Sequence, residues 1–295
     1  PPPTFCPHCR FQRRLAYRND RKLFWNTCKS SGEKIISLYP EQSNLNVYSD
    51  REWRSDSWDA MSYGRDYDFS KNFFEQFRQL ASEVPRQSNS IEGNVRSDYI
   101  VNAGWCKDCY LLSNSNDSEE CYYGNAIDVC KNCFESSHTQ KCENCYESFW
   151  NEKCNRTHFS VQNEECTESW FLKNCKGCIS CFGCVNLRNK NYHIFNKQYS
   201  KEEYNSKLES FKLHTWSGLE KAKTDIKKFW NQHPVKYIKG THNIGVSGEY
   251  IMYSKNAKNC YLINGGENLR YSQYLLMPTT KDCYDLTIWG MNNEL

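Results

Sequence analysis

Between residues 106 and 189, every third position of the chain holds a compact residue. All thirteen cysteines of this segment obey that spacing, and Ser, Thr, Asn, Gly, Leu or Ile fill the other positions of the triplet. Six of the cysteines also share one column of period twelve, which begins at Cys106 and ends at Cys178. Four compact residues in every twelve predict a narrow four-sided coil with three residues on each side.

This pattern favours a β-solenoid over a helix or an ordinary meander. A strict period of three leaves one face of a 3.6-residue helix within two turns, and Asn, Ser, Gly and Cys are weak helix formers. The alternation of period two that marks a half-buried strand is absent. We therefore expect a mainly β fold, whose compact side chains point inward and whose turns stack about 4.8 Å apart.

A second column of the repeat carries rings and follows the second cysteine column by one residue. Its members are Tyr110, Tyr122, Phe134, Tyr146, His158, Trp170 and Phe182. In a coil they point outward and form an aromatic column on one side. Either a neighbouring helix, domain or second chain covers this column, or it binds bases, sugars or a peptide. It is thus the expected surface for a protein partner or for self-association.

Other segments flank the repeat. Asp68 is expected to cap a helix that ends near Glu83 before Pro85, with Phe73, Phe74 and Phe77 in the core. Residues 200–231 predict two helices, the first opened by a capping box at Ser200 and the second capped by Thr215 or Ser217. Cysteine–aromatic steps at Cys260 and Cys283, with Tyr271-Ser272 between them at spacings of twelve and eleven residues, predict that the coil resumes.

These elements divide the chain into five regions. We expect a zinc-ribbon-like module at 1–40, an α+β connection at 41–105, the solenoid at 106–189, a small helical insertion at 190–245, and incomplete resumed coils at 246–295.

The N-terminal region has features of a metal-binding ribbon. Cys6-Pro7-His8-Cys9 has the spacing of a zinc knuckle, and Cys28 is a third thiol, but Ser31 stands where a fourth ligand would lie. The alternatives are a ribbon held by packing and a zinc site completed from elsewhere. The same region is basic, which is typical of nucleic-acid or protein contacts. Its candidate nucleic-acid-binding residues are Arg10, Arg13, Arg14, Arg18, Arg21 and Lys22.

Charge and cysteine content limit the setting. The net charge is only +3 and the mean hydropathy is -0.86, with no run of 18 apolar residues, so no membrane segment is expected. Residues 106–189 hold eight basic and twelve acidic residues, a charge of -4 between basic flanks. The chain has 18 cysteines, but their short regular spacing differs from a secreted disulfide framework. A reducing, cytoplasmic location is therefore expected.

The thiols and carboxylates suggest two further activities. Cys130, Cys133, Cys142 and Cys145 meet if adjacent turns stack, which suits zinc or an iron–sulfur cluster, although cysteine as a small apolar filler explains continuous columns more simply. Five aspartates suit the metal site of a metal-dependent nuclease, whereas a role in helix caps and turns explains them without a catalytic function. These aspartates are Asp50, Asp56, Asp59, Asp66 and Asp68.

Several phrases carry a family resemblance. They are Cys6-Pro7-His8-Cys9 with Arg13-Arg14, the run from Tyr63 to Phe69, the Cys-x-x-Cys triplets, and Leu187 through Tyr199. In these the chain resembles uncharacterised zinc-ribbon plus Cys-repeat proteins of candidate-phyla (Patescibacteria-type) bacteria. The resemblance covers most of the chain and implies no established activity. It also implies a second ribbon cysteine pair, which Ser31 interrupts here.

No complete catalytic constellation is visible in the sequence. We therefore expect a non-enzymatic binding or scaffold protein, with nucleic acid or a ribonucleoprotein as its partner. A metal-binding protein and a metal-dependent nuclease are the alternatives.

Overall fold

The computed structural model describes all residues except 1–2, 18, 20, 277–279 and 289–295. In this described part, five α-helices and seventeen short strands form small sheets, so the fold is mixed α and β. The chain divides into two compact units. The central unit is Asn19–His233, and the terminal unit joins Pro1–Arg18 to Pro234–Leu295. The boundary between Arg18 and Asn19 falls inside the predicted 1–40 module.

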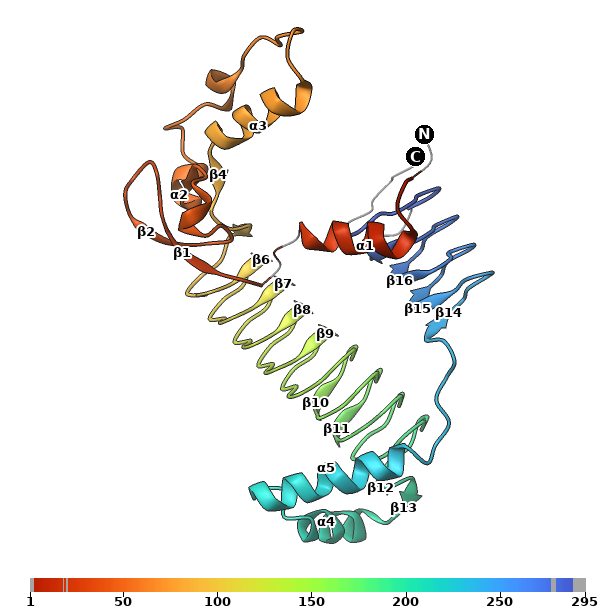
Figure 1. Cartoon of the computed structure of the whole chain (residues 1–295). Coiled ribbons are helices and arrows are strands. Elements are labelled where there is room, and N and C mark those ends of the chain that lie inside the picture. Colours follow the sequence, from red (N-terminus) through yellow and green to blue (C-terminus); the bar gives the residue numbers. More distant parts are fainter. Residues whose placement is uncertain (1–2, 18, 20, 277–279, 289–295) are drawn as a thin grey trace. The chain divides into compact units, whose positions relative to one another are not determined.

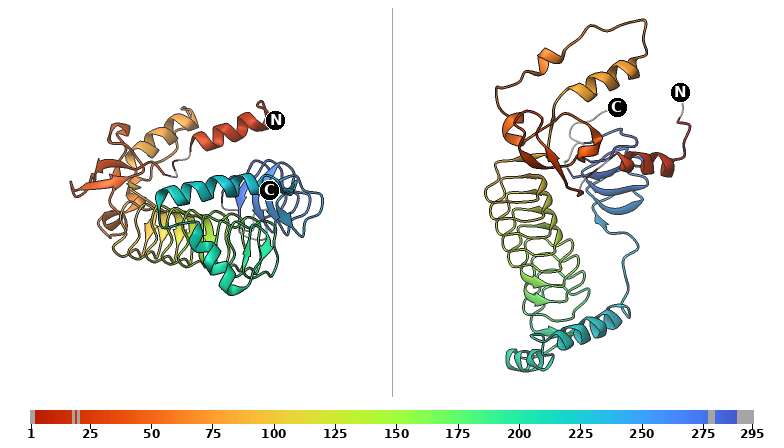
Figure 2. Two further views of the ribbon diagram at one scale, coloured as in Figure 1. Left: turned by 90° about the horizontal axis from the view of Figure 1, so that it is seen from below. Right: turned by 60° about the vertical axis from the view of Figure 1, so that its left-hand side comes forward.

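The central unit contains a long stack of twelve-residue turns, residues 91–194 (Figures 1 and 2). Each strand pairs in parallel with the segment twelve residues further on, as in Val101↔Ser113 and Ser113↔Asn125. Isolated bridges continue this register, for example Phe182↔Ile194. Its strands are β5 (Ile91–Glu92), β6 (Val101–Gly104), β7 (Ser113–Asn116), β8 (Asn125–Asp128), β9 (Ser137–Gln140), β10 (Asn155–His158) and β11 (Thr167–Trp170).

Each side of a turn repeats an inward, an outward and a corner position. Cys106 is inward and buried, Lys107 is outward, and Asp108 is the corner, with a φ of 54°. A positive φ recurs at every third residue from Gly93 to Phe195, mostly at residues other than glycine. This left-handed conformation is unfavourable for L-residues, so the backbone hydrogen bonds between turns must offset its cost.

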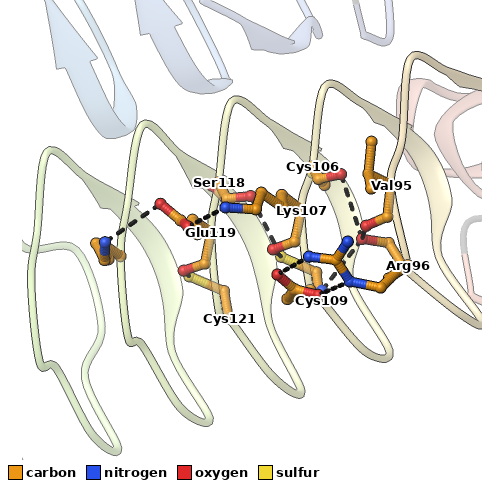
Figure 3. Close-up of polar contacts among 11 residues, drawn as sticks. Val95, Arg96, Cys106, Lys107, Cys109, Ser118, Glu119 and Cys121 are labelled. Carbon is orange, nitrogen blue, oxygen red and sulfur yellow. Dashed lines mark hydrogen bonds and ion pairs between the residues drawn. The ribbon is translucent and has the colours of Figure 1, made fainter.

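Backbone bonds between turns use two of the three amides on each side. The amide of Lys107 donates to the Ser118 carbonyl at 2.9 Å, and that of Asp108 donates to the Val95 carbonyl at 3.0 Å. Figure 3 shows that outward side chains also connect the turns, since the Lys107 Nζ lies 2.8 Å from a Glu119 carboxylate oxygen. Only the inward amide has no backbone acceptor in this pattern.

Inward side chains satisfy that third amide. The Ser160 hydroxyl donates to the His158 carbonyl at 2.8 Å and accepts from the Leu172 amide, one turn on, at 3.0 Å. The Cys166 thiol donates to the Glu164 carbonyl at 3.4 Å. Short side chains that both donate and accept therefore suit the inward columns, which explains the abundance of Ser, Asn, Thr and Cys there.

A connecting region precedes the long stack. It contains an antiparallel hairpin of β1 (Phe24–Thr27) and β2 (Lys34–Ser37), and a parallel pair of β3 (Val47–Tyr48) and β4 (Arg86–Gln87). Two α-helices and two 3-10 helices accompany these strands. They are η1 (Glu41–Ser43), α2 (Asp50–Trp53), η2 (Ala60–Tyr63) and α3 (Phe73–Glu83).

Helix α3 differs from its prediction in two respects. Its N-cap is Asn72, because Asp68 instead accepts from the Ser70 amide and fixes a separate turn. The helix ends at Glu83 as expected, but none of its residues is buried. Phe74 is 70% exposed, so the predicted core face lies on the surface.

Two helices cover the last turns of the long stack. Helix α4 (Lys201–Ser210) begins with the predicted capping box between Ser200 and Glu203, and α5 (Trp216–Trp230) is capped by Thr215. A short hairpin, β12 (His193–Ile194) with β13 (Lys197–Gln198), leads into them.

The terminal unit contains a short stack, residues 240–288. Its parallel sheet orders β14 (Gly240–Thr241), β15 (Gly248–Met252), β16 (Cys260–Asn264) and β17 (Gln273–Leu275). The turn after β16 has fourteen residues, as the bridge Arg270↔Tyr284 shows.

The twelve-residue spacing from Cys260 to Ser272 is one turn of the short stack, whereas the step from Ser272 to Cys283 is not. Tyr261 pairs with Gln273, which places Cys260 and Ser272 in one column. The longer turn places Cys283 beneath Leu269 instead, because Arg270 pairs with Tyr284.

Helix α1 (Pro7–Ala16) belongs to the same unit. The predicted knuckle at Cys6–Cys9 is the start of this helix, with Pro7 in its first turn. No helix in the described part of the chain combines the length and the apolar character needed to cross a bilayer.

Candidate functional site

The predicted aromatic column is present on the long stack, and its members differ in exposure. Parallel bridges join Tyr110 to Tyr122, Phe134, Tyr146 and His158 in turn, so the rings lie in register. The column continues through Trp170 to Phe182. Phe134 is 43% exposed, whereas Phe182 is fully buried.

Helices α4 and α5 cover the second half of this column. Phe182 packs in one apolar cluster with Tyr204 of α4 and with Ala222 and Ile226 of α5. Tyr146 and Trp170 lie against the same cluster. The interpretation that a helix covers the column therefore holds for its second half.

Helix α5 also places one positive charge against this surface. The Lys223 ammonium of α5 lies 3.2 Å from the Glu147 carboxylate and 4.7 Å from the centroid of the Phe159 ring. Glu147 and Phe159 occupy successive positions of the corner column next to the aromatic column. A cationic, apolar helix is thus the occupant that this surface accepts within the chain itself.

The first half of the column lies outside that cluster: Phe134 is exposed, Tyr110 and Tyr122 are half-buried, and exposed corner residues widen the surface. We call Tyr99, Tyr110, Tyr122, Tyr123 and Phe134 the exposed strip. Tyr99 and Tyr123 each make edge contacts with Tyr110, at centroid distances of 5.4 and 5.8 Å. Tyr122 stacks on Phe134 at 4.7 Å. The period-twelve aromatic column found in the sequence does not contain Tyr99 or Tyr123. These two residues occupy corners, and the backbone turn at each corner brings their rings against the outward Tyr110.

The surroundings of the exposed strip are acidic. Asp98 pairs directly with Tyr110 across turns, and Glu135 is the exposed corner after Phe134. Two lysines on the adjacent side of the turns are already paired, since Lys107 and Lys131 both form ion pairs with the Glu119 carboxylate, at 2.8 and 3.2 Å. Phosphate contacts need unpaired basic groups, so this surface suits a cationic polypeptide better than a nucleic acid.

The candidate nucleic-acid residues belong to both compact units. In the terminal unit, Arg10 and Arg14 form ion pairs with Asp285 at 2.6 and 3.1 Å, and Arg14 also donates to the Tyr271 carbonyl at 3.0 Å. They attach α1 to the short stack. The Arg13 guanidinium lies 4.8 Å from the Phe5 ring.

The other three candidates lie elsewhere or are not described. Arg21 and Lys22 are exposed in the central unit, and Arg18 lies outside the described residues. The guanidinium groups of Arg10 and Arg14 are thus already paired within the terminal unit.

The three ribbon thiols occupy different settings. Cys6 and Cys9 are exposed in the terminal unit, whereas Cys28 is buried in the central unit. Burial opposes ionisation of Cys28, but hydrogen bonds from Ser31, Ser49 and Ser30 lower the pKa of its thiol overall. Within the described residues, no three His, Cys, Asp or Glu side chains form a group that would hold a metal ion.

Cys130, Cys133, Cys142 and Cys145 do lie together, as stacking predicted. The Cys133 thiol is hydrogen bonded to Cys121, Cys130 and Cys145, and these contacts, followed by burial, raise its pKa. It also donates to the Lys131 carbonyl at 3.4 Å. The hydrogen bond with Cys133 instead lowers the pKa of the Cys130 and Cys145 thiols, so the four buried sulfurs form one hydrogen-bonded network.

The aspartates of the nuclease hypothesis serve local structure where contacts are seen. Asp50 pairs with Arg54 at 3.0 Å, and Asp59 caps η2 by accepting from the Met61 amide. Hydrogen bonds from the Ser70 hydroxyl and amide lower the pKa of Asp68 to about 2. Asp56 and Asp66 are exposed. The described residues show no carboxylate group able to hold a catalytic metal.

Helix α3 adds an aromatic surface that the sequence assigned to the core. Phe73 stacks on Phe77 at 5.8 Å and contacts Phe74 at 5.4 Å, and all three rings are exposed. Their helical spacing predicted an apolar face correctly. It could not show whether the chain itself covers that face.

Comparison with known proteins adds no assignment. No protein-family model matches the sequence, and no curated protein is detectably similar to it.

Proposed function

We propose that this protein is a non-enzymatic binding scaffold whose long stack is a rigid β-solenoid. Its function is to hold a helical, basic segment of another protein on the exposed strip. The observation that carries the proposal is the division of one aromatic column into a half packed against α4–α5 and a half outside that cluster, which is half-buried at Tyr110 and Tyr122 and exposed at Phe134.

The covered half supplies the chemistry expected of the partner. There, α5 buries Ala222 and Ile226 on the rings and directs Lys223 to Glu147. Tyr122 and Phe134 continue the same register, and Glu135 occupies the same corner column as Glu147. A partner helix with small apolar residues on one face and a lysine on its flank complements this surface.

Nucleic acid, the partner class favoured by the sequence, is the weaker candidate for this surface. The rings of the exposed strip contact one another and leave no wide spacing for intercalated bases. Asp98 and Glu135 would repel phosphate. Arg13, Arg21 and Lys22 stay available for such contacts elsewhere.

Photo-crosslinking in the native host tests the proposal. A photoreactive amino acid replaces Phe134, which is 43% exposed, and a matched chain carries it at Val129, an apolar corner of a different column that is 55% exposed. We expect one discrete protein adduct from position 134 and none of the same mass from position 129. With the purified partner, Phe134→Glu should weaken binding at least about tenfold, while Val129→Glu should leave it unchanged.

Two results would overturn the proposal. One is the same set of adducts from both positions. The other is binding of single-stranded RNA that weakens steeply with salt and is lost when Arg13, Arg21 and Lys22 are changed to Glu, because that would assign the function to nucleic acid.

A further inference from the structure

Cys6 and Cys9 are unlike the other cysteines of the chain. Of the 18 cysteines, these two are exposed and sixteen are buried. The buried thiols line the stacks or, like Cys28, lie under the hairpin region. Only this pair can meet a reagent or a second protein without unfolding.

The two thiols are held in contact by the start of α1. Cys6 is the N-cap, in extended conformation, and Cys9 lies in the first turn, with Pro7 between them. The Cys9 amide donates to the Cys6 Sγ at 3.4 Å, and the two Sγ atoms are 3.2 Å apart. Disulfide formation therefore requires only a small approach of the sulfur atoms.

The environment distinguishes the two sulfurs. The first amides of a ten-residue helix point at Cys6, and its partial positive charge favours an anion there. Hydrogen bonds from the amide and the thiol of Cys9 lower the pKa of Cys6, with a smaller contribution from Arg10. The shared hydrogen bond raises the pKa of Cys9. One thiolate beside one thiol is the arrangement of an attacking and a resolving cysteine.

The helix that carries the pair is fixed to a stack. Arg10 forms an ion pair with Asp285 at 2.6 Å and donates to the Phe5 carbonyl at 2.7 Å, just before Cys6. Arg14 donates to the Thr287 hydroxyl at 3.0 Å. The N-terminal turn of α1 is thus positioned from both sides, and the pair is displayed at an anchored end.

A zinc site is the competing use of the same thiols. A structural zinc needs four ligands. In the described residues neither His8 nor any other His, Cys, Asp or Glu joins Cys6 and Cys9 in a group of three. Two ligands alone leave a dithiol that can undergo redox chemistry.

We propose that Cys6 and Cys9 form a redox-active dithiol that exchanges with an accessible disulfide. The Cys6 thiolate attacks one sulfur of the substrate disulfide, forming a mixed disulfide and releasing the other sulfur as a thiolate, which takes up a proton. Cys9 then loses its proton and attacks Cys6, which closes the Cys6–Cys9 bond and releases the second thiol. The chain loses two electrons and the Cys9 proton, the solvent supplies the second proton, and one substrate disulfide becomes two thiols. This activity is independent of the exposed strip.

A redox titration of the full chain with reduced and oxidised glutathione tests the proposal. After acid quenching and alkylation, peptide mass spectrometry should show one two-electron transition, confined to a Cys6–Cys9 disulfide. The buried Cys28 and the stack cysteines are internal controls and should stay reduced. Disulfides spread over many cysteines would overturn the proposal.

Single variants test the assigned order. With oxidised glutathione, Cys9→Ser should accumulate one glutathione on Cys6, because nothing resolves it. Cys6→Ser should react at Cys9 at least about tenfold more slowly at neutral pH, since that thiol is less ionised. Equal rates would overturn the asymmetry. A protein disulfide, such as those of intact insulin, replaces glutathione in a parallel assay and shows which source reacts faster.

Addition of zinc distinguishes a redox-active dithiol from a metal site. One equivalent of Zn²⁺ added to the reduced chain should leave the rate of Cys6–Cys9 oxidation unchanged. Stoichiometric zinc that blocks oxidation of both thiols would assign the pair to a metal site instead.

Discussion

The Asp285 carboxylate lies 2.6 Å from the Arg10 guanidinium, although the two residues are 275 positions apart in the sequence. Arg14 reaches the other oxygen of the same carboxylate at 3.1 Å. One anion from the last described turns of the short stack thus pairs with two cations of α1. This contact joins the beginning of the chain to its far end in one compact unit.

Removing that anion should release α1. We expect Asp285→Asn to weaken the attachment by about 1–2 kcal/mol, because two charge-assisted, partly buried contacts are lost. Hydrogen exchange of the α1 amides should accelerate roughly tenfold, since about 1.4 kcal/mol corresponds to a factor of ten. Asp282→Asn is the matched control, because Asp282 accepts only from Asn268 on the surface. Unchanged exchange in the Asp285 variant would contradict the assigned role.

Inward hydroxyls should be replaceable by thiols but not by alanine. Ser160→Ala removes both the donor to His158 and the acceptor for the Leu172 amide. Leaving these buried groups unpaired should cost about 1–3 kcal/mol in the free energy of unfolding, whereas Ser160→Cys should cost less than about 1 kcal/mol. Urea denaturation measures both. Equal losses in the two variants would show that size alone, not hydrogen bonding, selects the inward residues.

Corner positions should prefer residues that tolerate a positive φ. Val129 is β-branched, has a φ of 56° and is exposed, so Val129→Asn should stabilise the chain by up to about 1 kcal/mol. Val95 is also an exposed valine, but it is outward and has extended backbone, so Val95→Asn should be neutral or destabilising. Thermal unfolding of the two variants gives the comparison. A gain at Val95 that matches the gain at Val129 would refute the conformational explanation.

Stability should fall in alkaline solution under reducing conditions. Burial raises the pKa of the Cys260 thiol, and a hydrogen bond with Cys178, together with burial, raises that of Cys166. The folded chain therefore holds these protons more tightly than the unfolded chain. The free energy of unfolding should be constant below about pH 8.5 and should decrease above it, as unfolded thiols ionise first. Denaturation at pH 7 to 10 measures the slope, and Cys260→Ser should reduce it. A stability that rises with pH would contradict the assignment.

The sequence could predict the parts of the fold that depend on local spacing. The twelve-residue register, the buried inward columns and the helices after Ser200 and Thr215 follow from spacing and capping alone. The positive φ at every third residue could not be predicted from the sequence, because the corners hold residues such as Glu120 and Phe159, which have no local preference for a positive φ. Contacts between turns override that preference.

The sequence could not show the contacts of site residues whose partners lie in distant segments. Arg10 and Arg14 resembled a nucleic-acid surface until Asp285, far along the chain, accounted for their charge. Phe73 and Phe77 had the spacing of a core helix face, yet nothing in the described chain buries them. The aromatic column was found by period, but its division into covered and exposed halves depends on how far α4 and α5 reach.

The regular corner at every third residue also constrains how such a protein can evolve. An insertion of one residue inside the long stack would turn an inward thiol outward and a charged corner inward, which no neighbouring turn could accommodate. Only the gain or loss of a whole turn keeps every column intact. The length of the stack can therefore change by duplication of thirty-six-nucleotide units, each adding about 4.8 Å. The length of the long stack can therefore take only discrete values, one for each whole number of turns.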